Sequence, residues 1–123
     1  MYVLLADSQA EERSALRQLF EFDPELYLVG ETSEARDLLV QTQTAHPDLV
    51  LLEWKLPGLG GANLVSALRC LVRPPKVVAF SEKMEARREA LAAGVDAFVS
   101  KEQPVEEMLN TVRAVGWLSP CFV

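Results

Sequence analysis

Five short runs of apolar residues recur along the chain, and each is followed by a stretch with helical periodicity. The clearest run, residues 49–52, is continuous and stops at the carboxylate of Glu53. A short unbroken apolar run is typical of a strand that is covered on both faces of a parallel sheet. Strands are therefore predicted at residues 2–6, 26–29, 49–52, 77–80 and 97–99.

Apolar residues three and four positions apart predict a helix after each strand. The predicted helices cover residues 10–22, 34–45, 62–72, 82–93 and the segment from 104 onward. Ser33 is the expected N-cap of the second helix, and Gly94 is expected to end the fourth in a left-handed conformation. Val105 is expected to begin the buried stripe of the last helix, with Met108 and Leu109.

Strict alternation of strand and helix predicts an α/β fold with right-handed crossovers. We expect a three-layer, flavodoxin-like (βα)5 doubly wound sheet with parallel strand order 2-1-3-4-5, whose site lies beside the first and third strands. One domain is expected over residues 1–116. Residues 117–123 form an apolar tail that could fold back, form a dimer contact, or be the stub of a linker to an output domain.

Composition narrows the class of protein. The chain has 123 residues, a net charge of −6 and a pI of about 4.8, so direct binding to nucleic acid is not expected. No apolar run reaches the roughly 20 residues of a membrane helix, and the first residues lack the basic start and long apolar region of a secretory signal, so we expect a cytoplasmic protein with no membrane partner. His46, Cys70 and Cys121 form no metal-binding pattern or catalytic triad.

Polar residues follow four of the predicted strands. Asp7 and Ser8 come after the first strand, Glu53 after the third, Ser81 after the fourth and Lys101 after the fifth. Because the carboxyl ends of parallel strands share one edge of the sheet, these side chains are expected to meet in one cleft.

These features together resemble the receiver domain of two-component response regulators. The resemblance covers about residues 1–116, and the segments that carry it are 4–7, 48–61, 77–81 and 94–101. The start of the last helix is most similar to that of receivers that precede helix-turn-helix output domains. The resemblance implies a role in phosphorelay signal transduction.

In that family an aspartate at the position of Glu53 accepts a phosphoryl group from a histidine kinase. The resemblance implies a Mg²⁺ site and a phosphoryl site at specific positions of this chain. The metal positions are Asp7, Ser8, Glu53 and the backbone carbonyl of Lys55. The phosphoryl-binding and switch positions are Ser81, Lys101 and Phe98.

Two departures from the family pattern change this expectation: Glu53 replaces the phospho-accepting aspartate, and Ser8 replaces the second acid of the metal site. Mg²⁺ requires oxygen ligands in near-ideal octahedral geometry, and the longer Glu53 displaces its carboxylate, to which catalysis by positioning is sensitive. Counting Asp7, Glu53 and Lys101 also leaves one negative charge fewer than in the family. We therefore expect no cofactor, Mg²⁺ at most weakly bound, no catalytic residue and no enzymatic activity.

The role of Glu53 itself is open between two hypotheses. Its carboxylate could lie near Lys101 and Ser81 as a partial mimic of a phosphoryl group, which carries more charge and more oxygens. Alternatively, Glu53 only forms a structural ion pair with Lys101. Lys55 is open between neutralising the cleft and pointing into water, and Trp54 between covering the cleft and packing in its loop.

The leading interpretation is an atypical receiver, or pseudo-receiver, that acts through protein contact. Its partners would be a histidine kinase or an output domain, bound through the face of the fourth helix, the fifth strand and the fifth helix; a homodimer stays open. The candidates on this face are Lys83, Arg87, Arg88, Glu106 and Glu107. One alternative is a receiver that is still phosphorylated and switches a DNA-binding output domain. Another is a small enzyme or cofactor binder on the same fold.

Overall fold

The computed structural model describes residues 1–117, in which five strands alternate with five helices. Each strand is followed by a helix, as the hydrophobic pattern predicts. The elements are β1 (Tyr2–Ala6), α1 (Ala10–Glu21), β2 (Tyr27–Thr32), α2 (Ala35–Ala45), β3 (Leu49–Glu53), α3 (Gly61–Arg69), β4 (Lys76–Ser81), α4 (Ala86–Ala93), β5 (Ala97–Ser100) and α5 (Val105–Gly116).

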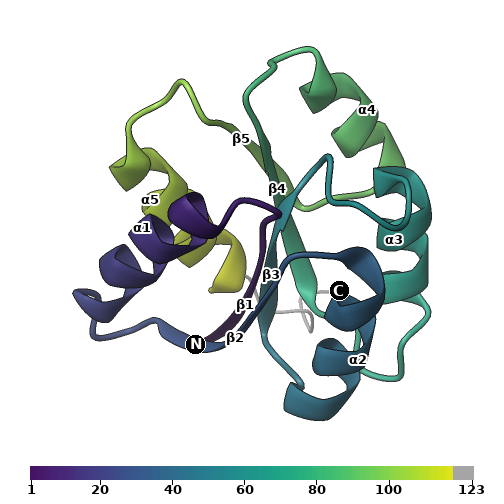
Figure 1. Ribbon diagram of the computed structural model, residues 1–123, viewed down its shortest axis with the longest axis horizontal. Helices are drawn as coiled ribbons and strands as arrows, with labels where there is room; N and C mark the ends of the chain where they lie inside the picture. The colour runs from purple at the N-terminus through teal and green to yellow at the C-terminus, as the bar shows by residue number, and fades with distance from the viewer. Residues whose placement is uncertain (118–123) are drawn as a thin grey trace.

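The five strands form one parallel sheet in the order β2-β1-β3-β4-β5. Helices α1 and α5 cover one face of the sheet, and α2, α3 and α4 cover the other (Figure 1). The predicted fold class, a flavodoxin-like α/β fold with this strand order, is confirmed.

Two apolar cores fill the two interfaces between sheet and helices. Alternate residues of each central strand point to opposite faces, so that Leu51 joins the core under α1 and α5 while Leu52 joins the core under α2, α3 and α4. All five residues of β3 are buried, which explains why its sequence lacks alternation. This double coverage fixes β3 firmly and places Glu53 at its carboxyl end.

Several predicted boundaries are wrong. Strand β2 runs to Thr32 rather than stopping at residue 29, because its pairing with β1 shifts by one residue beside Gly30. A bulge of this kind lets a strand continue past an unpaired residue. A β-carbon at Gly30 would meet the side-chain ends of Gln41 and Leu4, the latter at 2.9 Å, so the glycine suits the close packing here and does not end the strand.

Two helix starts also differ from prediction. Glu34, not Ser33, is the N-cap of α2, and its carboxylate accepts hydrogen bonds from the backbone N of Asp37 and Arg36 at 2.6 and 3.2 Å. Helix α4 starts at Ala86 rather than residue 82, because the preceding segment forms tight turns such as that from Ala86 N to Lys83 O (3.1 Å).

The remaining helix predictions are mostly confirmed, except that α3 ends at Arg69 rather than at residue 72. Gly94 ends α4 with φ of 102°. Met108, Leu109 and Val112 are buried on α5, but Val105 is 44% exposed because it lies at the first residue of the helix, beyond the edge of the core. Within residues 1–117, no helix is long and apolar enough to span a membrane. Apart from exposed Trp117, the tail predicted at 117–123 lies outside the described residues.

Candidate functional site

The carboxyl ends of β1, β3, β4 and β5 bring the predicted polar residues together. Glu53 and Ser81 are the last residues of β3 and β4, where Glu53 pairs with Phe80, one residue before Ser81, and both line the same cavity. Asp7 and Lys101 directly follow β1 and β5. The Asp7 side chain is fully buried and Glu53 is 8% exposed, so the charges meet in a poorly solvated place.

Glu53 is bonded to the loop after β1. Its Oε2 accepts two hydrogen bonds from Ser8, one from the backbone N and one from the hydroxyl Oγ, both at 2.8 Å. Its other oxygen, Oε1, lies 3.7 Å from Lys101 Nζ. Both oxygens of the carboxylate therefore face groups of the same domain.

Lys101 lies closer to another acid, Glu12 in the first turn of α1. Lys101 Nζ is 2.7 Å from Glu12 Oε1, a full hydrogen-bonding distance. The ammonium also lies 5.1 Å from the centre of the Phe80 ring, where a cation is attracted by the π-electrons. Burial alone would lower the pKa of Lys101, but the hydrogen bond and charge of Glu12, together with Glu53, raise it.

The carboxylate of Asp7 lies beside Glu12 and is bonded to the loop after β1. Its Oδ1 accepts from Gln9 N at 2.9 Å, whereas its buried Oδ2 receives no donor. Burial, followed by the hydrogen bond to Glu12, raises the pKa of Asp7 to about 8. Burial would also raise the pKa of Glu12, but hydrogen bonds from Asp7 and Lys101 outweigh it and lower that pKa. Of this pair, Asp7 therefore holds a proton in preference to Glu12.

The side chains as arranged do not fit the Mg²⁺ site that the family resemblance implies. The Ser8 hydroxyl is committed to Glu53, and Oε2 of Glu53 is committed to Ser8. No three Asp, Glu, His or Cys side chains of residues 1–117 are grouped so that they could hold a metal ion. Glu12 restores the carboxylate missing from the sequence-based charge count, so charge alone does not disfavour the ion. The poor fit thus rests on geometry, and weak Mg²⁺ binding stays a prediction.

The other predicted site residues are less engaged. Ser81 Oγ accepts from Lys83 N at 3.2 Å, which stabilises the loop after β4. Phe98 is half-buried and packs against the core under α2, α3 and α4. Lys55 is exposed in the loop after β3. With Ser81 turned to its own loop, the geometry fits a structural ion pair of Glu53 better than a phosphoryl mimic.

Trp54 packs inside its loop rather than covering the cleft. Its side chain is buried, and the ring fills the space above Gly61, where a β-carbon would lie 2.7 Å from Trp54 Cε2. This contact joins the end of β3 to the start of α3. Trp54 therefore stabilises the loop that carries Lys55.

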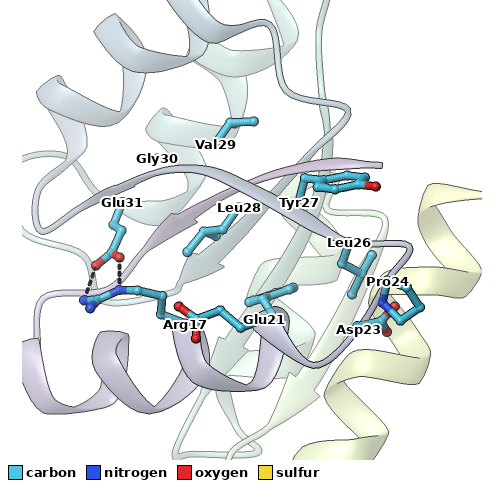
Figure 2. A pocket seen from close by; sticks show the side chains of 11 residues that line it. Arg17, Glu21, Asp23, Pro24, Leu26, Tyr27, Leu28, Val29, Gly30 and Glu31 are labelled. Carbon is cyan, nitrogen blue, oxygen red and sulfur yellow. Dashed lines mark hydrogen bonds and ion pairs between the residues drawn. The ribbon is translucent and has the colours of Figure 1, made fainter.

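A small cavity of about 150 Å³ remains at this site. The residues that line it are Gln9, Glu53, Lys55, Ser81, Glu82, Lys83 and Lys101. A larger groove of about 590 Å³ lies between α1 and β2, bordered by the ion pair of Arg17 and Glu31 (Figure 2). That groove includes none of the predicted site residues, so it is separate from the site.

Sequence reasoning missed Glu12. It was apparent only as part of an acidic stretch after β1, and its position in the first turn of α1 suits the helix dipole without any further role. The spacing of five residues from Asp7 could have indicated Glu12, because it places Glu12 in the first turn of α1, close to the end of β1. Its partner Lys101 is too distant in sequence to be inferred from spacing.

Comparisons with known proteins point to one family. Residues 3–113 match the family model described as the response regulator receiver domain. The nitrate/nitrite response regulator protein NarL of Escherichia coli is 29% identical over 90% of this chain and 52% of its own length. The DNA-binding transcriptional activator DevR/DosR of Mycobacterium tuberculosis is 30% identical over 93% of this chain and 54% of its own.

Solved structures show the same fold. The response regulator domain of Thermotoga maritima CheB superimposes with a TM-score of 0.86 at 21% identity, covering 98% of both chains. This chain spans about half the length of the two curated relatives.

Proposed function

Because this chain belongs to the response regulator receiver domain family, we propose that it is an atypical receiver that signals through protein contact and does not accept a phosphoryl group. The single observation that carries the proposal is the state of Glu53. The carboxylate at the phospho-acceptor position is bonded to Ser8 through Oε2 and faces Lys101 through Oε1.

The two departures from the family pattern fit each other. Glutamate is one methylene longer than aspartate, so its carboxylate reaches the loop after β1. A serine in that loop supplies a hydroxyl donor, where an acid would repel the carboxylate at close range. The carboxylate at the acceptor position is therefore satisfied by groups of the same domain, which supports a function that needs neither metal nor phosphate.

The surface expected to meet partners is open to solvent. Lys83, Arg87, Arg88, Glu106 and Glu107 are all exposed. Between these charges, Met84, Leu91 and Val105 are 51%, 39% and 44% exposed. A mixture of exposed apolar residues and charges of both signs suits a partner protein bound in a defined register.

A second candidate function is a receiver that is still phosphorylated and controls a DNA-binding output domain. It is favoured by the presence of Ser81 and Lys101 at the phosphoryl-binding positions. The similarity to a DNA-binding transcriptional activator that is about twice as long also supports it.

Intact-mass measurement after incubation with acetyl phosphate and Mg²⁺ separates the two functions. The native chain is expected to keep its mass. A double variant, Ser8→Asp with Glu53→Asp, restores both family acids and is expected to gain one phosphoryl group as an acyl phosphate, which Mg²⁺ removal prevents. A Mg²⁺-dependent mass gain in the native chain would overturn the proposal and favour the second candidate.

A further inference from the structure

Lys101 has two carboxylate neighbours, and the closer one is Glu12. The distance from Lys101 Nζ to Glu12 Oε1 is 2.7 Å, against 3.7 Å to Glu53 Oε1. Only the first is a hydrogen-bonding distance for an ammonium and a carboxylate. The lysine at the end of β5 is therefore held toward α1 rather than toward the end of β3.

Glu12 is itself fixed in place. Its Oε1 is buried and lies against the ammonium of Lys101. Because the Lys101 side chain is only 15% exposed, water screens this pair poorly. Movement of Lys101 toward another anion would leave the Glu12 charge half-buried without its cation, which is costly.

We propose that Glu12 is a positioning residue that holds Lys101 against α1 and thereby withholds it from a phosphoryl-type anion entering the pocket. This inference rests on the proposed function, since it explains how the pocket stays closed to phosphate even though Lys101 is present. Glu53 and Ser8 alter the acceptor position, whereas Glu12 acts independently of them on the lysine that would bind the phosphoryl oxygens.

The substitution Glu12→Gln tests the role with little change of shape. Glutamine keeps the length of the side chain but removes the charge that attracts Lys101. Glu11→Gln is the matched control, because Glu11 is the exposed neighbour in the same helical turn and carries the same charge. Glu53→Gln measures how strongly the more distant carboxylate, that of Glu53, acts on Lys101.

The first measurement is the pKa of Lys101, followed by NMR through its side-chain carbons in the otherwise native chain. We expect Glu12→Gln to lower this pKa more than Glu53→Gln does, and Glu11→Gln to leave it close to the native value. A larger drop in Glu53→Gln, or equal effects of Glu12→Gln and Glu11→Gln, would overturn the assignment of Glu12.

The second measurement is the rate of phosphorylation by acetyl phosphate in the Ser8→Asp, Glu53→Asp background. Adding Glu12→Gln is expected to raise the rate several-fold, since Lys101 becomes free to contact the transferred group, and adding Glu11→Gln is expected to leave it unchanged. Equal rates with the two additions would contradict the proposal. If the background variant takes no phosphate at all, the account of Ser8 and Glu53 fails, while the Lys101 pKa still decides the role of Glu12.

Discussion

Ser8 donates two hydrogen bonds to the same oxygen of Glu53, from its backbone N and from its hydroxyl, each 2.8 Å long. One contact joins the loop after β1 to the end of β3, the two strands beside which the site of this fold lies. Both residues stand at positions where the resemblance to the family implies an acid. Their substitution thus replaces a repulsive pair of acids by an acid and its donor.

The Ser8–Glu53 contact gives a first prediction for stability. Ser8→Ala keeps the backbone N–H but removes the hydroxyl donor from a charged acceptor, which is expected to cost about 1–2 kcal/mol in the free energy of unfolding. Urea unfolding at neutral pH measures it. Ser66→Ala, an exposed serine on α3, is the control and should change stability by less than about 0.5 kcal/mol. Equal changes in the free energy of unfolding of the two variants would show that the Ser8 hydroxyl does not stabilise the fold.

Asp7 predicts how stability depends on pH. Its pKa is about 8 in the folded chain, against 3.8 as its ordinary value. Because the folded state holds this proton more tightly than the unfolded state, the stabilisation is complete below pH 3.8. It is lost progressively as the pH rises through about 8.

Asp7→Asn removes this titration and keeps the shape. When the pH is raised from 5.5 to 8.5, the free energy of unfolding of the variant should increase by at least about 1 kcal/mol relative to that of the native chain. One pKa unit corresponds to about 1.4 kcal/mol. Unfolding in urea at both pH values, without divalent ions, gives the comparison. Glu102→Gln, at an exposed acid, controls for net charge. Parallel pH profiles of Asp7→Asn and the native chain would contradict the prediction.

The packing of Trp54 distinguishes two neighbouring glycines. A β-carbon at Gly61 would lie 2.7 Å from the Trp54 ring, whereas at Gly60 the nearest contact is Asn63 Nδ2 at 4.0 Å. Gly61→Ala is expected to destabilise the chain by about 1–3 kcal/mol through overpacking, although alanine normally favours a helix. Gly60→Ala should be nearly neutral. Thermal unfolding of the two variants checks this, and similar melting temperatures would count against the tight contact.

Much of the fold could be predicted because one signal was repeated. Each strand is a short apolar run, each helix has its own buried stripe, and alternation alone leads to a parallel doubly wound sheet. Boundaries failed where a local contact decided them. Glu34 rather than Ser33 caps α2, and the turns before Ala86 delay α4.

The candidate site was predictable only in part, for a physical reason. Strand ends of a parallel sheet share an edge, so the approach of Asp7, Glu53 and Lys101 followed from topology. The choice of Lys101 between two carboxylates depends on side-chain geometry and on the position of α1, which sequence patterns do not encode. The charge count made without Glu12 was incomplete for the same reason.

The most direct test of the central claim is a titration of Mg²⁺, with and without beryllofluoride, followed by the fluorescence of Trp54. Trp117→Phe removes the exposed second tryptophan, so that the signal comes from the buried ring beside the Lys55 loop. We expect no saturable change in this chain up to millimolar Mg²⁺. When Ser8→Asp and Glu53→Asp are added to Trp117→Phe, Mg²⁺ should give a saturable change in fluorescence. Saturation in the chain with native Ser8 and Glu53 would contradict a pocket filled by its own side chains.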